Sequence, residues 1–416
     1  MNNPQAIEAQ ENFKKGTTAY CDKNYNKAEK LLKKSIKGIP SCEAWLNMGL
    51  VYVAICRFDE ALKAFNSSIQ CNSQYAEAWL NLGSTYKAIG RFDEALEAFQ
   101  SSIRCNPQYA EAWNNIGIVY HLQNNEAMAD GFFKKALEIK PEYADANWNF
   151  ALSLLKRACD GDYSLFPEGW ARFEYRFFKT GAVTLSAHGK GTRWIGQEGQ
   201  DKTLLVVFEQ GIGDNIMFAR YLPYLTSRFK TVYVQCIDEM RPIFSGLNLV
   251  NDISSIEYDY WVPVCSLAAH FDFIPNGKYI VHNETRNEGD IGIVWQGSTA
   301  HHNDANRSVD RKLFNRFSKY GSLVSLQYGD NHSIKSFSDT MSIINGCKFI
   351  ISVDTSVAHL AAAMGKTVFI LVPDIDTDFR WGAVSKKSIW YPTAELIRGL
   401  DFDECERRVA EYVQNA

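Results

Sequence analysis

Large apolar residues and small residues recur at a fixed spacing of 34 positions in the N-terminal part of the chain. Trp45, Trp79 and Trp113 mark the pattern, and a glycine, a tyrosine, an alanine and a phenylalanine follow each of them at constant offsets. Small residues allow helices to pack closely, and large ones fill the space between neighbouring units. One unit cannot bury this face alone, so the pattern predicts a stack of at least about three repeats.

The period resembles that of tetratricopeptide repeats, which consist of two antiparallel helices each. A divergent unit precedes the tryptophans, with Gly16, Tyr20 and Pro40, and a partial unit follows near Ala144. We therefore expect a helical solenoid within residues 1–160. Repeats of this kind indicate binding or assembly and do not by themselves indicate chemistry.

Four asparagines share the 34-residue spacing, namely Asn47, Asn81, Asn115 and Asn149. Carboxamides in a row along a concave surface would bind the backbone of an extended peptide. The alternative is that asparagine belongs to the repeat consensus and helps the repeats to pack. The sequence favours neither interpretation.

From about residue 201 the pattern changes to short β-branched runs that alternate with longer mixed segments. The alternation predicts parallel strands flanked by helices. The expected strands are Leu204–Phe208, Thr231–Gln235, Tyr260–Val264, Ile291–Trp295, Leu323–Leu326, Phe349–Val353 and Val368–Leu371. A polar stretch, His282–Asp290, interrupts the series, so we expect two Rossmann-like halves at 201–288 and 289–416, after a linker with a connecting helix at 161–200. A ligand is expected between the halves, at the carboxyl ends of the strands.

Composition adds constraints on compartment and partners. The chain has 416 residues, of which 46% are hydrophobic and 22% charged, without a run of about 18 apolar residues. Its polar start shows no secretory signal, and its ten cysteines form no C-x-x-C pair, which predicts a cytoplasmic protein with free thiols and no structural metal. Basic and acidic residues number 18 and 18 in 1–160 and 26 and 30 in the remainder, so a nucleic-acid partner is less expected.

The first candidate for chemistry is the segment Phe208–Ile216, which joins an apolar strand to an amphipathic helix expected to begin near Asn215. Its glycine-rich turn would bring the backbone of Gln210, Gly211 and Gly213 close to a ligand and would hold Asp214 as a general base. The alternative is that the glycines only make a tight turn and Asp214 caps the helix.

Two segments of the second half favour an anionic ligand. The region from Trp295 to Ser308 offers flexible backbone, a hydroxyl and the guanidinium of Arg307, which suit a diphosphate, although an exposed surface loop would have the same composition. Ile350–Gly365 runs from a strand into a helix, whose free N–H groups favour an anion. His359 would either contact that ligand or serve the fold.

A third segment, Pro373 to Trp381, contains Asp374, Asp376 and Asp378. This spacing suits a metal-bound nucleotide, but we favour substrate positioning by Arg380 and Trp381.

Together these motifs resemble bacterial glycosyltransferases that fuse tetratricopeptide repeats to a catalytic region like that of the heptosyltransferases. The matching stretches cover nearly the whole chain: Trp170–Phe177, Glu209–Asp214, Phe218–Tyr221, Trp295–Ser308, Ser325–Gln327, Val353–Leu360 and Ser388–Pro392. The resemblance implies a GT-B fold, an inverting sugar transfer from a nucleotide-activated donor, Asp214 as the base, and no obligatory metal or cofactor. The residues that we expect to bind the donor are Gln296, Ser298, Arg307, Gln327, Asp354, Thr355, Ser356, His359 and Arg380.

Departures from the pattern bear on substrate identity. Asn215 and Met217 stand where many relatives carry Thr and Gln, and Asp374–Asp378 replaces a more apolar loop. The expected acceptor is a protein or glycan recruited partly by the repeats, and oligomers are compatible with the sequence. The alternatives are a glycosyltransferase that acts on modified nucleic acid, and a repeat scaffold whose nucleotide-sugar-binding half is inactive.

Overall fold

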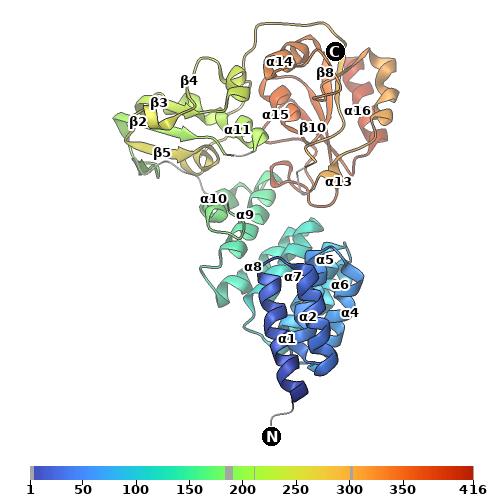
Figure 1. Cartoon of the computed structure of the whole chain (residues 1–416). Coiled ribbons are helices and arrows are strands. Elements are labelled where there is room, and N and C mark those ends of the chain that lie inside the picture. Colours follow the sequence, from blue (N-terminus) through green and yellow to red (C-terminus); the bar gives the residue numbers. More distant parts are fainter. Residues whose placement is uncertain (1–3, 183–190, 210, 300–302, 416) are drawn as a thin grey trace. The chain divides into compact units, whose positions relative to one another are not determined.

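The computed structural model describes residues 4–182, 191–209, 211–299 and 303–415, which divide into two units, Met1–Phe150 and Ala151–Ala416 (Figure 1). The first unit is helical. Its helices α1 to α8 pair in sequence order, and α2, α4 and α6 also pack on the first helix of the next pair. Their bounds are α1 Pro4–Cys21, α2 Tyr25–Gly38, α3 Cys42–Ala54, α4 Phe58–Cys71, α5 Ala76–Ala88, α6 Phe92–Cys105, α7 Ala110–Leu122, α8 Glu126–Ile139 and α9 Ala144–Cys159, the last continuing into the second unit.

Glycine and phenylalanine of each repeat meet at the contact between its two helices. A Cβ atom at Gly83 of α5 would lie 2.7 Å from the ring of Phe99 on α6, and the same relation holds at Gly49 and Gly117. Phe99 is fully buried. The recurrence of Gly and Phe in the sequence therefore reflects one close helix contact made once per repeat.

This contact yields a prediction about stability. Gly83→Ala is expected to lower the free energy of unfolding by about 1–3 kcal/mol, because the added methyl overpacks the contact with Phe99. The control is Gly131→Ala on α8, where a Cβ would meet nothing within 4 Å. That change should raise stability by up to about 1 kcal/mol, since alanine favours the helix over glycine. Urea denaturation of the two variants measures both effects, and equal effects would contradict the assignment.

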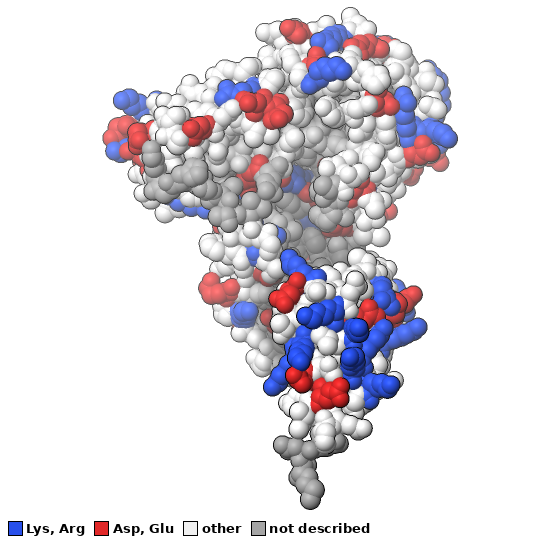
Figure 2. All heavy atoms as spheres, viewed as in Figure 1, with Lys and Arg blue, Asp and Glu red and all other residues white. Residues whose placement is uncertain are grey.

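Charge on the repeats is uneven. Basic side chains gather over the first repeats on the face that Figure 2 shows. Helix α2 alone carries five lysines and one glutamate, and all five lysines are exposed. The balance of 18 basic and 18 acidic residues over 1–160 therefore conceals a local basic surface.

Among the described residues, the second unit contains two parallel sheets. The first has the order β1-β5-β2-β3-β4 and the second β10-β9-β8-β6-β7. The strands of the first are β1 Thr192–Arg193, β2 Gly199–Val207, β3 Phe229–Gln235, β4 Asn248–Val250 and β5 Tyr260–Pro263. Those of the second are β6 Ile291–Val294, β7 Leu323–Ser325, β8 Phe349–Val353, β9 Val368–Val372 and β10 Ala394–Arg398. A helical solenoid followed by an α/β region with parallel sheets is thus confirmed.

Helices cover both sheets. The α-helices of the second unit are α10 Phe166–Phe173, α11 Ile212–Phe218, α12 Leu222–Leu225, α13 Asp304–Arg307, α14 Phe337–Gly346, α15 Ser356–Ala363 and α16 Phe402–Asn415. Short 3₁₀ helices connect them: η1 Tyr163–Leu165, η2 Glu174–Phe177, η3 Ala219–Tyr221, η4 Asp238–Phe244, η5 Ile253–Ser255, η6 Val264–His270, η7 Arg311–Tyr320 and η8 Phe379–Trp381. One face of the second sheet buries Ile351 and Phe369 against Phe402 of α16 and Phe314 of η7.

In each sheet there is one point at which the chain stops adding strands on one side and begins to add them on the other. From β2 the chain adds β3 and β4 on one side and then β5 on the other, and from β6 it adds β7 on one side and β8 on the other. Ligands of open α/β sheets bind beyond the carboxyl ends of the strands at such switch points. The loops after β2, β5, β6 and β8 are therefore the places to look for a site.

The segment predicted as a linker contains packed structure. Trp170 of α10 is buried and makes edge contacts with the rings of Phe218, Phe379 and Trp390. At the end of α9, the carboxylate of Asp160 accepts hydrogen bonds from three consecutive backbone N–H groups, those of residues 383–385, at 2.6, 3.1 and 2.9 Å. The stretch 151–177 is thereby anchored in the α/β unit.

Candidate functional site

Asp214 lies in the first turn of α11, directly after β2. The expectation that this helix begins near Asn215 is wrong, because α11 begins at Ile212 and Gly211 is its N-cap residue. A Cβ at Gly211 would lie 2.0 Å from Oδ2 of Asp214, so glycine is required for the carboxylate to fold back over the turn. Gln210, predicted in the same loop, lies outside the described residues.

The buried side chain of Asn215 closes this loop. Its Oδ1 accepts a hydrogen bond from the N–H of Glu209 at 2.9 Å, and its Nδ2 donates to the carbonyl of Glu209 at 2.7 Å. Asn215 thus holds both backbone groups of Glu209 and fixes the loop that leads to Asp214.

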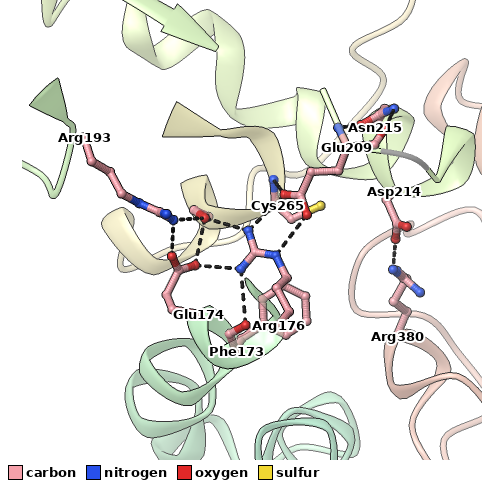
Figure 3. Close-up of polar contacts among 10 residues, drawn as sticks. Phe173, Glu174, Arg176, Arg193, Glu209, Asp214, Asn215, Cys265 and Arg380 are labelled. Atoms are coloured by element: carbon pink, nitrogen blue, oxygen red, sulfur yellow. Dashed lines mark hydrogen bonds and ion pairs between the residues drawn. The ribbon is translucent and has the colours of Figure 1, made fainter. Parts of the chain in front are cut away.

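Arg380 of η8 forms ion pairs with both Asp214 and Asp378, and Figure 3 shows its guanidinium pointing at Asp214. The side chain of Arg380 is 13% exposed and that of Asp214 is 30% exposed. Burial lowers the pKa of Arg380 to about 10. Burial, followed by the charge of Asp354, raises the pKa of Asp378 to about 7. The predicted base and a predicted donor-binding cation, from loops of different sheets, are therefore in direct contact.

His359 of α15 is buried and packed on all sides. Its Nδ1 lies 2.9 Å from the hydroxyl of Tyr391, and its ring stacks on Trp381 with centroids 5.0 Å apart. A Cβ at Gly213 would lie 2.9 Å from its Cδ2 atom, so Gly213 is needed for α11 to approach α15. Its Nε2 lies 3.9 Å from Oδ1 of Asp354. In this structure the imidazole serves the packing of α11, α15 and η8.

The environment of His359 predicts a pH dependence of stability. Burial, and then the charge of Arg220, lower the pKa of His359 to about 3, whereas an unfolded histidine has a pKa of about 6.5. The unfolded chain therefore binds more protons between these values, and the stabilisation is complete above about pH 6.5 and is lost as the pH falls. From pH 7 to pH 5 the free energy of unfolding should drop by about 2 kcal/mol more in the native protein than in His359→Phe. Denaturant unfolding at both pH values tests this, and identical drops would contradict it.

Arg307 binds the protein's own backbone. Its Nη1 donates to the carbonyl of Asp354 at 3.0 Å, and its Nε lies 3.5 Å from Oδ1 of Asp304. A Cβ at Gly297 would lie 2.2 Å from its Nη2 atom. Ser308 adds a bond from the N–H of Gly297 to its Oγ at 3.2 Å. Arg307 thus joins the loops after β6 and β8, and its role toward a diphosphate stays a prediction.

The remaining predicted donor-binding residues lie on loops at the carboxyl edge of the second sheet. The backbone N–H of Gln296 donates to Oε1 of Gln327 at 3.2 Å, which joins the loops after β6 and β7, and Ser298 lies in the first of these loops. Thr355 is the N-cap residue of α15, and its Oγ1 lies 3.1 Å from Oγ of Ser352. Ser356 is the first residue of that helix, where N–H groups have no partner within the helix.

A buried ionic network beside this site was missed by the sequence reasoning (Figure 3). Arg176 of η2 donates through Nε and Nη2 to the two carboxylate oxygens of Glu209, each at 2.9 Å, and through Nη1 to Glu174 at 2.7 Å. Ser266 accepts from Nη2 of Arg176 at 2.7 Å, and Arg193 pairs with Glu174. The signal in the sequence was that Trp170–Phe177 and Glu209 belong to the stretches on which the expected resemblance to glycosyltransferases rests.

The surroundings of the network favour the charged forms of Arg176 and Glu174. Burial acts to lower the pKa of Arg176, but its hydrogen bond to Glu209 and the neighbouring negative charges outweigh burial and raise that pKa. Burial acts to raise the pKa of Glu174, but Arg176 and Arg193 lower it. The network therefore consists of ion pairs, and these hold η2 against the loops after β2 and β5.

No group of three or more His, Cys, Asp or Glu side chains is placed to hold a metal ion in the described part of the chain. Of the three spaced aspartates, Asp378 pairs with Arg380, whereas Asp376 has a left-handed backbone, with φ of 54°. The carbonyl of Asp376 accepts from Nδ2 of Asn303 at 2.8 Å. Independence from metal remains a prediction.

The four asparagines of the repeats make contacts within the first unit. Asn47 donates to Oγ1 of Thr17 at 2.9 Å, Asn149 donates to Oδ1 of Asn114 at 3.0 Å, and Asn81 and Asn115 donate to carbonyls of their own helices. Oδ1 of Asn115 also accepts from Lys87, whose pKa burial lowers to about 8. These contacts accord with the packing interpretation, and the peptide ladder stays a prediction.

Comparison with known proteins bears on the repeats. Residues 40–106 and 74–142 match the model of the tetratricopeptide repeat family. The N-terminal region contains tetratricopeptide repeats. Protein FlbA of Caulobacter vibrioides is 41% identical over 56 residues, which are 14% of this chain and only 9% of FlbA.

Two solved structures are similar to the repeat region. MamA aligns at 23% identity over 43% of this chain and 98% of its own, with a TM-score of 0.37. The Pseudomonas aeruginosa protein pilF aligns at 18% identity over 41% of this chain and 78% of its own, with a TM-score of 0.38. Within the described residues, no helix has the length and apolar character needed to cross a membrane.

Proposed function

We propose that the α/β unit is a GT-B glycosyltransferase that moves a sugar from a nucleotide-activated donor to a hydroxyl group, without an obligatory metal. The observation that carries the proposal is the direct contact of Asp214, after β2, with Arg380 of η8, which follows β9. A carboxylate and a cation that converge from loops at the carboxyl ends of strands in two parallel sheets are what a base and a diphosphate ligand require.

In the proposed reaction, Asp214 takes the proton of the acceptor hydroxyl as its oxygen attacks the anomeric carbon. The bond from that carbon to the diphosphate oxygen breaks, and the nucleoside diphosphate leaves with the electron pair. N–H groups at the start of α15 and the guanidinium of Arg380 would stabilise its negative charge. The repeats would recruit the acceptor, a protein or glycan.

The test is a thermal-shift panel of UDP-, GDP-, ADP-, CDP- and dTDP-sugars on the full-length protein, because a ligand of the native state raises its melting temperature. Two variants of one residue locate the site. Ser356→Pro removes the first N–H of α15 at a position where proline fits a helix, and Thr355 before it already has extended backbone. Ser356→Ala removes only the hydroxyl. A selective shift that the proline variant loses and the alanine variant keeps would support the proposal.

The opposite result would favour a different class of protein. If none of these nucleotide sugars raises the melting temperature, the glycosyltransferase proposal fails and the inactive scaffold becomes the better interpretation. If Ser356→Pro retains the shift, the nucleotide sugar binds elsewhere in the chain, and its diphosphate does not bind at the start of α15.

A further inference from the structure

Arg380 connects the predicted base to the predicted donor site. Its guanidinium contacts Asp214 of α11 and Asp378 beside η8. The adjacent Trp381 stacks on His359 of α15 at 5.0 Å. Arg380 therefore belongs to a turn that packs against α15, the helix at whose start the diphosphate is proposed to bind, while its guanidinium is paired with Asp214 and Asp378.

The pairing leaves both groups unsuited to catalysis. A carboxylate beside a guanidinium is stabilised as an anion, which makes Asp214 a weaker base. Arg380 also keeps an unused donor: its Nε is buried and has no hydrogen-bond partner among the described residues. A diphosphate supplies several acceptor oxygens and suits the planar fork of arginine.

We infer that Arg380 exchanges partners: the diphosphate of the donor takes the guanidinium away from Asp214 and thereby frees the base only when a donor is bound. This inference rests on the proposed function and adds an order of events to it. Arg380 contacts the carboxylates of both Asp214 and Asp378, and the contact with Asp214 is the one that a diphosphate would replace.

The exchange is measurable without turnover. Carbodiimide activates a carboxyl group in its protonated form, and a guanidinium paired with a carboxylate disfavours that form. Labelling of Asp214 with carbodiimide and an amine, quantified by peptide mass spectrometry, should therefore rise severalfold when UDP, GDP, ADP or inorganic pyrophosphate binds and releases the carboxylate from Arg380. Asp201, whose side chain is 82% exposed and pairs with Lys202, is the internal reference and should not change.

Variants of Arg380 complete the test. In Arg380→Gln, Asp214 should be labelled at the high level without any ligand. This variant should also bind more weakly the diphosphate that raises the labelling in the native protein. If this variant does not fold, Arg380→Lys keeps the cation without the fork and should show a smaller response to the ligand than the native protein.

The outcomes separate the two proposals. If a nucleoside diphosphate binds and the labelling of Asp214 stays the same or falls, partner exchange is wrong while the donor site stands. If none of the four probes binds, the donor site and the exchange are both overturned. A low labelling of Asp214 in folded Arg380→Gln would also refute the inference, because the guanidinium would then not be what restrains the base.

Discussion

Replacing Asp214 with asparagine is expected to lower the rate of sugar transfer by about 10²-fold or more, because the amide cannot accept the proton of the attacking hydroxyl. The fold should persist, since Asp378 still pairs with Arg380 and Asn215 still closes the loop. The measurement is turnover with the donor that the thermal-shift panel selects, together with the melting temperature of the variant.

Asp201→Asn provides the control, because this exposed carboxylate lies on the strand that leads to the same loop. It should leave turnover and donor binding unchanged. Full turnover in Asp214→Asn would exclude this residue as the base. A loss of donor binding in that variant would show that Asp214 helps to bind the donor instead.

Arg176→Met is expected to destabilise the α/β unit by about 3–5 kcal/mol, because it leaves the carboxylates of Glu174 and Glu209 partly buried without their shared cation. Arg172→Met is the matched control on the preceding turn, where the pair with Glu168 is more exposed and is worth about 1 kcal/mol or less.

Because the chain has two units, the unfolding of residues 151–416 must be measured separately from that of the repeats. Hydrogen exchange in increasing urea, read by peptide, separates it from that of the repeats. If Arg176→Met matched Arg172→Met, the network would contribute packing and little electrostatic stabilisation.

The repeats could be predicted because their signal is periodic. Trp45, Trp79 and Trp113 with their following glycines identify each unit, and the contact of Gly83 with Phe99 explains why the period carries those residues. The strands rich in β-branched residues were predicted for a similar reason, since β8, for example, is buried along its whole length. Patterns that bury apolar surface are visible in the sequence.

The strands that the sequence did not predict lie at sheet edges. β1 and β4 are two and three residues long and flank the first sheet, and β10, with Glu395 and Arg398, flanks the second. Edge strands are short or polar and so lack a strong hydrophobic signal. The start of α11 was misplaced because Gly211 and Gly213 were taken for a turn, whereas Gly213 is helical and packs against His359.

The partners of polar residues could not be predicted from one sequence. Arg176 and Glu209, or Asp214 and Arg380, are far apart in the chain, and only the packing of separate elements brings them together. Arg307 and His359 could be named as candidates from the sequence, but their burial could not be predicted. Their hydrogen bonds to other groups of the protein were therefore seen only in the structure.

The arrangement of strands also has a consequence for how the chain acquires its structure. Each repeat helix contacts its neighbours in sequence, so the solenoid can form by local steps that require little loop closure. The first sheet instead pairs β1 with β5, its first strand with its last, and all its pairs are parallel. Non-local pairing of this kind is slow, because the chain must close long loops before the contacts stabilise it. The repeats should therefore be folded while the α/β unit is still assembling, and they would emerge from the ribosome first.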